Sequence, residues 1–133
     1  MTDFGYVFDK LQRNPFMDQF ITYLKEGKIM ATQCKSCGAT HMPPREHCTC
    51  LSTEIEWVEV PPEATLKAFT MINFAPDVLQ EKQPYFVGIA ETPGGLRLMG
   101  WITGAASQNP KVGMKIKIVT QELEGDKIVY KFT

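Results

Sequence analysis

The sequence lacks a long apolar run, an excess of charge of one sign and a secretory signal. Although 44% of its residues are hydrophobic, no stretch approaches the roughly 20 consecutive apolar residues of a membrane-spanning helix, so we expect no membrane partner. The 14 Lys and Arg residues nearly balance the 15 Asp and Glu residues, so no overall positive field attracts a nucleic-acid backbone. The first residues do not follow the basic, apolar and small-residue order of a signal peptide, which predicts a cytoplasmic protein.

Cysteine is also scarce, and its distribution is uneven. All four cysteines lie between residues 34 and 50 instead of being spread along the chain. In a reducing compartment, this clustering favours a metal site over disulfide bonds.

The spacing of the cysteines predicts a structural zinc site. Cys34 and Cys37 frame a C-K-S-C-G knuckle, in which Gly38 lets the backbone turn towards sulfur. Cys48 and Cys50 form the second pair, and the ten residues between the pairs suffice for a short hairpin. Four thiolates occupy all four coordination positions of a tetrahedral zinc ion and leave none for water or substrate, so we expect the metal to have a structural role.

Two alternatives concern the same window. His41 and His47 could each replace a thiolate, but with the tetrahedron already filled we expect both to be solvent-facing loop residues. A cage of four thiolates also holds iron, which would make the segment a rubredoxin-like electron-transfer site. Iron in such a cage absorbs visible light and zinc does not, so the colour of the protein distinguishes the two metals.

The residues before the cysteine window predict two short amphipathic helices over residues 3–26. The first would begin behind an Asp3 cap, and Asn14-Pro15 would supply the cap and the first turn of the second. The second helix would end near Gly27 and carry one apolar stripe, which packs either on this chain or on another subunit. The stripe consists of Phe16, Phe20, Tyr23 and Leu24.

The residues after the cysteines predict a small β-barrel. Runs rich in β-branched and aromatic residues alternate with turn signals at residues 93–95 and 124–126. About five strands after the proline pair at 61–62, without a second helical repeat, favour an OB-fold barrel. Residues 75–84 would form a loop over one end of that barrel. The expected strands are Glu54–Val60, Ala64–Phe74, Tyr85–Glu91, Leu96–Ile102, Met114–Gln121 and Lys127–Phe132.

These elements predict an α+β, mainly β fold in three parts. N-terminal helices occupy residues 1–27, a rubredoxin-like zinc ribbon occupies residues 28–53, and an OB-fold domain occupies residues 54–133. A chain of 133 residues is long enough for one modest core or two small modules, and it is too short for two large domains.

The order of these features resembles a known family. The chain is similar to the zinc-ribbon/OB-fold proteins long filed as a domain of unknown function. The shared features are paired helices, a ribbon with C-x-x-C-G and a P-P-R step at residues 42–45, a second cysteine pair, and a barrel with a late Val112-Gly113 turn. The chain departs from the family at residues 48–50, where C-P-x-C is usual. The resemblance implies a non-catalytic accessory subunit that binds acyl-CoA and joins a thiolase-like condensing or cleaving enzyme in a hetero-oligomer.

A coenzyme A ligand would need particular side chains. Its phosphates call for cations, and its adenine ring and pantetheine arm call for an apolar channel. Lys35 and Arg45 are the candidates for the phosphates, although as isolated surface cations they would simply be solvated. Tyr85 and Phe86 are the candidates to flank the arm or the adenine. No catalytic pair is evident, because both histidines lie in the ribbon and the thiols are committed to zinc.

A second function fits the same architecture. A zinc ribbon joined to an OB-fold also occurs in proteins that bind single-stranded nucleic acid, where aromatic side chains stack on bases and cations follow the backbone. The near-neutral charge argues against this function, as do barrel strands whose aromatic residues are not interleaved with Lys or Arg. We therefore expect acyl-CoA and a thiolase-fold subunit as partners, and no nucleic acid.

Overall fold

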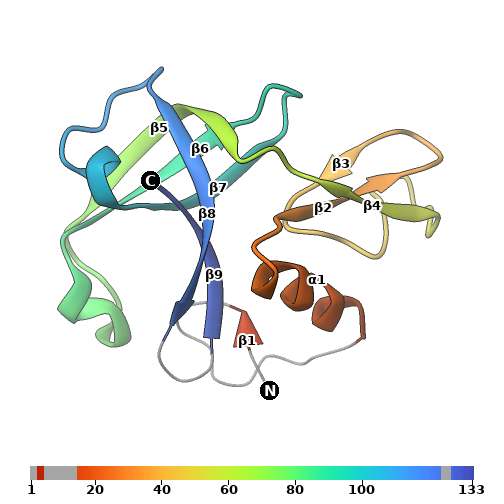
Figure 1. The fold of residues 1–133 in the computed structure, drawn as a ribbon, viewed down its shortest axis with the longest axis horizontal. Helices are drawn as coiled ribbons and strands as arrows, with labels where there is room; N and C mark the ends of the chain where they lie inside the picture. Colours follow the sequence, from red (N-terminus) through yellow and green to blue (C-terminus); the bar gives the residue numbers. More distant parts are fainter. Residues whose placement is uncertain (1–2, 5–14, 124–126) are drawn as a thin grey trace.

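The computed structural model describes residues 3–4, 15–123 and 127–133 of the chain. A small three-stranded sheet with a helix beneath it lies beside a β-barrel (Figure 1). Within the described residues, every helix is too short or too polar to cross a bilayer. In chain order the elements are β1 (Asp3–Phe4), α1 (Pro15–Lys25), β2 (Met30–Cys34), β3 (Thr40–His41), β4 (Ile55–Glu59), β5 (Glu63–Ile72), the 3₁₀ helix η1 (Asp77–Lys82), β6 (Tyr85–Glu91), β7 (Arg97–Ile102), the 3₁₀ helix η2 (Gly104–Ser107), β8 (Lys115–Leu123) and β9 (Lys127–Phe132).

Helix α1 begins and ends where the sequence predicts the second helix. Pro15 occupies the first turn, where a missing N–H group costs nothing. At the other end, Gly27 has a φ of +81°, and the N–H groups of Gly27 and Lys28 donate to the carbonyls of Leu24 (3.0 Å) and Tyr23 (2.9 Å). These bonds form a Schellman cap, which requires a left-handed residue that glycine adopts without strain.

The apolar stripe of α1 packs on this same chain. Phe20 and Leu24 are fully buried. Phe16 stacks on Trp57 of β4, with ring centroids 4.9 Å apart and an interplanar angle of 24°. Tyr23 meets the same indole edge-on at 5.4 Å. Aromatic pairs at these separations are stabilised beyond their buried area. Of the two packing partners left open by the sequence, the structure therefore selects the chain itself.

The first two described residues form a strand, so the prediction that a helix begins behind Asp3 is wrong at this point. Strand β1 pairs in parallel with Lys127 and Ile128 at the start of β9. Among the described strands, β7 reaches β9 only near its other end, so this stretch of β9 offers an open edge. Pairing with an open strand edge satisfies backbone N–H and C=O groups, as the hydrogen bonds of a helix would. The rest of the expected first helix, residues 5–14, lies outside the described residues.

Strands β3, β2 and β4 form a small antiparallel sheet in that order. Strand β4 pairs along the whole of β2, so that Ile55 lies opposite Cys34. The strand expected at residues 54–60 therefore pairs with the cysteine-bearing sheet, although the predicted division at residue 53 places it with the barrel. The proline pair at 61–62 has no N–H group to donate to a ladder of hydrogen bonds, and it separates β4 from the barrel strand β5.

The remaining strands close into a barrel of five. Their order is β5-β6-β7-β9-β8, and the pairing of β8 with β5 closes the sheet. Strands β7 and β9 run parallel, whereas the other barrel neighbours are antiparallel. Closure of this kind pairs the edges of the sheet with each other, apart from the stretch of β9 on which β1 pairs, and is the arrangement of an OB-fold. The predicted mainly β fold, with a ribbon and an OB-fold barrel, is confirmed.

One hydrophobic core joins the two parts of the molecule. Side chains from α1, from the small sheet and from the barrel belong to a single buried cluster. Such continuity means that the barrel and the small sheet share apolar contacts instead of meeting across a wet interface. The contributors from outside the barrel are Phe20, Ile21, Leu24, Ile29, Ala31 and Val60.

The expected loop at residues 75–84 has a defined shape. It contains η1, and the backbone N–H of Ala75 donates to Oε1 of Gln83 at 2.8 Å, which closes its base. Leu79 is buried and anchors the short helix. In Figure 1 the loop lies at one end of the barrel, on the side away from the small sheet.

Two glycines allow close packing inside the barrel. A Cβ atom on Gly88 would lie 2.8 Å from Cδ1 of Leu66 and 2.9 Å from the carbonyl oxygen of Ala68. A Cβ atom on Gly100 would lie 3.2 Å from the ring of Phe132. The interior is therefore filled by side chains, as in other small barrels, and Gly88 has no room for even one methyl group.

We expect Gly88→Ala to lower the free energy of unfolding by about 1–3 kcal/mol, because overpacking would displace the backbone at Ala68. Urea unfolding followed by circular dichroism measures the change. Gly94→Ala is the matched control, since a Cβ atom there meets nothing within 4 Å. That variant should stay within about 0.5 kcal/mol of the wild type. Equal stability of the two variants would contradict the tight interior.

Candidate metal centre and ligand-binding surface

Two backbone turns carry the four cysteines to one point. At the end of β2, the N–H of Gly38 donates to the carbonyl of Cys34 at 2.9 Å, and Gly38 has a φ of +79°. In the second turn, the N–H of Leu51 donates to the carbonyl of Cys48, also at 2.9 Å. Leu51 has a φ of +72°, so a left-handed residue follows each cysteine pair. The shorter C-x-C spacing thus still forms a knuckle.

The sulfur atoms have the spacing of a tetrahedral metal site. All four Sγ atoms lie within 4.8 Å of one another. The Sγ atoms of Cys34 and Cys50 are 3.6 Å apart, and those of Cys37 and Cys48 are 3.3 Å apart. Zinc–sulfur bonds of about 2.3 Å in a tetrahedron separate the sulfur atoms by about 3.8 Å. The four thiols are free and not joined in disulfides, so the donor set fits one structural zinc ion.

The surroundings of the sulfur atoms favour a thiolate at Cys48. The backbone of Cys50 and then the ring of His41 donate hydrogen bonds that lower the pKa of Cys48 to about 5. The backbone of Ala39 lowers the pKa of Cys37, but hydrogen bonds with the other three thiols outweigh it and raise that pKa to about 12. Sulfur atoms this close cannot all be charged on their own, so a cation is needed to hold four thiolates together.

His41 departs from its predicted place. Instead of facing solvent from a loop, it is half-buried in β3, and its Nε2 lies 3.4 Å from Sγ of Cys48. Pairing of His41 with Thr32 of β2 holds the ring in this position. A hydrogen bond from outside the ligand set orients a ligand and tunes its basicity. His47 is exposed, as expected.

The structure separates the four residues predicted to contact coenzyme A. Lys35 and Arg45 are exposed in the loops that follow β2 and β3, and the N–H of Arg45 donates to Oγ1 of Thr32 in β2 at 2.9 Å. Tyr85 and Phe86 begin β6, directly after the loop that carries η1. In Figure 1 that loop and the small sheet lie on opposite sides of the molecule. The two cations and the two aromatic residues therefore do not form one site.

Tyr85 and Phe86 instead line a pocket of about 340 Å³ at the end of the barrel. Tyr85 stacks on Trp101 of β7, with ring centroids 4.4 Å apart and an interplanar angle of 27°. Nζ of Lys82, from η1, lies 5.5 Å from the centre of the Trp101 ring. Sequence reasoning missed Lys82 and Trp101, because only strand pairing and the loop bring them to Tyr85. The full lining is Lys82, Pro84, Tyr85, Phe86, Trp101, Ile102, Thr103, Gly104 and Ser107.

An apolar surface continues from this pocket along β6 and β7. Val87 lies opposite Trp101, and Ile89 lies opposite Met99. Ile89 is 40% exposed and Met99 is 67% exposed, which is unusual for large apolar side chains in neighbouring positions. A groove of about 380 Å³ extends from these two residues to Met42 of the ribbon. We call the outward side of β6 and β7 from Val87 to Met99 the apolar track.

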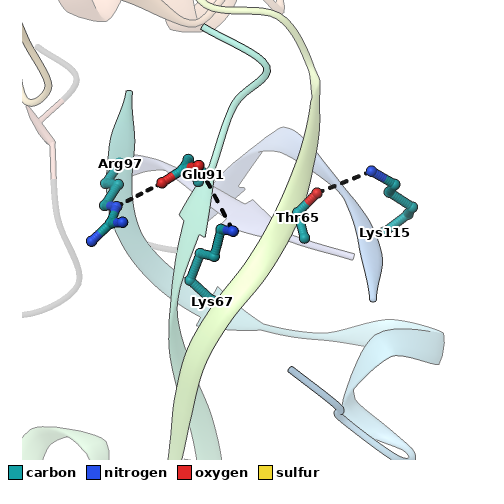
Figure 2. Close-up of polar contacts among 5 residues, drawn as sticks. All are labelled: Thr65, Lys67, Glu91, Arg97 and Lys115. Atoms are coloured by element: carbon teal, nitrogen blue, oxygen red, sulfur yellow. Dashed lines mark hydrogen bonds and ion pairs between the residues drawn. The ribbon is translucent and has the colours of Figure 1, made fainter. Parts of the chain in front are cut away.

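Charged side chains bound the apolar track at its far end. Figure 2 shows Glu91 between Arg97 and Lys67, with Nε of Arg97 2.7 Å from one carboxylate oxygen and Nζ of Lys67 3.8 Å from the other. The hydrogen bond from Arg97 and the charge of Lys67 lower the pKa of Glu91. Alongside, Nζ of Lys115 donates to Oγ1 of Thr65 at 3.1 Å. These cations are engaged with neighbours, so the row forms a polar boundary.

Comparison with known proteins agrees with this geometry. A family model described as the rubredoxin-like zinc ribbon domain of ChsH2 matches residues 22–56, and one described as its C-terminal OB-fold domain matches residues 57–121. A DUF35 domain-containing scaffold protein from Methanocaldococcus jannaschii is 26% identical over 100 residues, which are 74% of this chain and 71% of that protein.

Two solved structures share the fold. The Ltp2-ChsH2(DUF35) aldolase chain aligns with a TM-score of 0.75 and 21% identity, covering 92% of this chain and 97% of that chain. A DUF35-family protein of unknown function from Sulfolobus solfataricus aligns with a TM-score of 0.59 and 28% identity, covering 87% and 85% respectively.

The fold and the sulfur cluster together define a zinc-ribbon/OB-fold protein. Both parts match models of one family, and the two matches follow each other without a gap from residue 22 to residue 121. The chain belongs to the ChsH2 family of DUF35 proteins. This is the family that the sequence resembles, so that prediction is confirmed.

We expect His41→Ala to weaken zinc retention about 10- to 100-fold, because Cys48 would lose the group that orients it. Competition against a chromogenic chelator measures zinc affinity, after elemental analysis has established the zinc content of the wild type. His47→Ala is the matched control, since that side chain is exposed, and its affinity should not change. Identical affinities for the two variants would remove His41 from the metal centre.

Proposed function

We propose that this chain is a non-catalytic accessory subunit that binds acyl-CoA and stabilises a thiolase-like acyl-CoA condensing or cleaving enzyme. The observation that carries the proposal is the uninterrupted family match over the ribbon and the barrel. Within that family, one relative is described as a scaffold protein and one structural neighbour is a chain of the Ltp2-ChsH2(DUF35) aldolase. Both descriptions support a role in holding other subunits together.

The ribbon would supply the rigid part of the scaffold. We assign Cys34, Cys37, Cys48 and Cys50 as ligands of a structural zinc ion, because their sulfur atoms have the required spacing. Bound zinc would supply folding free energy, on the order of 10–16 kcal/mol in small zinc peptides. With four thiolate ligands it would have no open position for substrate.

The described side chains support a non-catalytic role. Both histidines of the chain lie in the ribbon, and His41 already faces a ligand sulfur. The thiols converge on one point and would be committed to zinc. Thiolase-type acyl transfer needs a nucleophile with a base in hydrogen-bond reach. In our proposal, the partner subunit supplies that chemistry.

The surface of the chain offers two places for the phosphates of acyl-CoA. Lys35 and Arg45 form one candidate pair on the ribbon, where both side chains are exposed. Lys82 forms another beside the aromatic residues of the barrel. The apolar track, with the groove that continues from it to Met42 of the ribbon, would suit the pantetheine arm, which needs a largely apolar channel.

Binding of single-stranded nucleic acid is the second candidate function. The stacked pair of Tyr85 and Trp101 favours it, because OB-fold proteins stack bases on such platforms. A net charge of −1 disfavours it, because affinity for a phosphate backbone depends on many Lys and Arg contacts. We therefore keep acyl-CoA as the ligand of the proposed function.

Co-purification tests the scaffold role. We expect the tagged full-length protein, isolated from its native host after nuclease treatment, to carry a thiolase-fold subunit in near-stoichiometric amount. Mass spectrometry identifies the subunit, and size-exclusion chromatography with light scattering gives the stoichiometry of the complex. Preparations that carry nucleic acid and no acyl-CoA enzyme would sink the proposal.

A zinc-site variant provides the matched control for the scaffold. We expect Cys37→Ser to lose zinc and to release the partner subunit, because the ribbon would lose its fixed shape. Ser36→Ala, one residue away, leaves all four sulfur atoms in place and should retain both zinc and partner. If Cys37→Ser holds the partner as firmly as Ser36→Ala does, the zinc ribbon is not part of the scaffold.

A further inference from the structure

The geometry points to the pocket beside Trp101 as a binding site for an adenosine phosphate. This inference rests on the proposed function, because acyl-CoA ends in an adenosine phosphate. The pocket has a volume of about 340 Å³ and lies where η1, β6, β7 and η2 meet. This volume falls within the range of about 300–1,000 Å³ that small-molecule sites occupy. We infer that the nucleotide end of acyl-CoA binds here and not on the ribbon.

The aromatic residues supply a platform for a flat ring. The Tyr85 and Trp101 rings are nearly parallel, with an interplanar angle of 27° and centroids 4.4 Å apart. Both side chains are only half-buried, so part of each ring stays accessible. Stacking of a nucleobase on such a ring is favourable for every base, because each base has a π-face. Because the two rings already stack on each other, a base would add to an outer face of the pair and not between the rings. Adenine can stack there without a specific hydrogen-bond partner.

A cation and polar groups lie beside the platform. Nζ of Lys82 is held 5.5 Å from the Trp101 ring centre, which places a positive charge next to the stacking site. Ser107 of η2 also lines the pocket, and its hydroxyl donates to the carbonyl of Gly104 at 2.7 Å and keeps two lone pairs for a ligand donor. A phosphate requires a cation, and the sugar hydroxyls require acceptors. The pocket offers both next to the ring.

The position of the pocket in the fold agrees with a ligand site. OB-folds bind their ligands on the face of the second and third barrel strands and with the loop that joins the first strand to the second. In this chain those strands are β6 and β7, and that loop carries η1 with Lys82. The apolar track then leads from Trp101 past Ile89 and Met99 towards Met42. A bound adenosine phosphate could thus extend its pantetheine arm along the barrel to the ribbon.

Calorimetric titration of the full-length protein tests this assignment with coenzyme A, ADP and pantetheine as probes. We expect coenzyme A and ADP to bind, and pantetheine, which lacks the nucleotide, to bind at least tenfold more weakly than coenzyme A. Trp101→Ala and Lys82→Ala should each weaken both nucleotide ligands about tenfold or more. Lys28→Ala is the matched control: it removes an exposed cation outside both candidate sites and should leave both affinities unchanged. Arg45→Ala tests the rival phosphate site on the ribbon, and we expect it to leave both affinities unchanged as well. Trp101→Phe retains a ring, and should recover part of the affinity lost in Trp101→Ala.

The possible outcomes separate this inference from the proposed function. If Arg45→Ala weakens coenzyme A binding and Lys82→Ala does not, the assignment of the nucleotide end to the pocket is wrong. Acyl-CoA would then bind on the ribbon, and the proposed function would stand. If ADP binds at the pocket and coenzyme A binds no more tightly than ADP, the pocket is still a nucleotide site, but acyl-CoA is not its ligand. Failure of both nucleotides to bind the wild type would overturn the pocket and the acyl-CoA ligand together. Tighter binding of an oligouridine, lost in the same two variants, would assign the pocket to nucleic acid.

Discussion

Four sulfur atoms within 4.8 Å of one another constrain the fold of the ribbon. They join the turn after β2 to the turn that precedes β4, so that the two strands pair along their length. Strand β4 then presents Trp57 to α1, which packs its aromatic stripe on that indole. Without the sulfur cluster, a segment with few regular elements would have to hold these contacts by itself, and small modules of this kind need a metal to fold.

Local chemistry made most of the fold predictable. The period of apolar residues located the barrel strands, and two of them, Tyr85–Glu91 and Lys127–Phe132, begin and end at the expected residues. Cysteine spacing and Gly38 predicted the first knuckle, and Gly27 predicted the end of α1. In each case a few neighbouring residues determine the outcome, so no knowledge of the rest of the chain was required.

Contacts between distant residues could not be predicted in the same way. The pairing of β1 depends on an open stretch of β9 that is more than a hundred residues away along the chain. His41 meets Cys48 because β3 pairs with β2, and the sequence contains no sign of that register. Lys82, Tyr85 and Trp101 come together through a loop and a strand ladder. Sequence patterns named Tyr85, but its neighbours required the structure.

Helix α1 touches both halves of the molecule, with contacts to β2 of the ribbon and to β9 of the barrel. The helix therefore fixes the position of the ribbon relative to the barrel, where a flexible linker between two small modules would leave them free to move. Any molecule that contacts both barrel and ribbon meets two surfaces that are already aligned, so its binding does not have to freeze a relative motion of the two parts. Pre-organisation of this kind strengthens binding by lowering its entropic cost, without a single added contact.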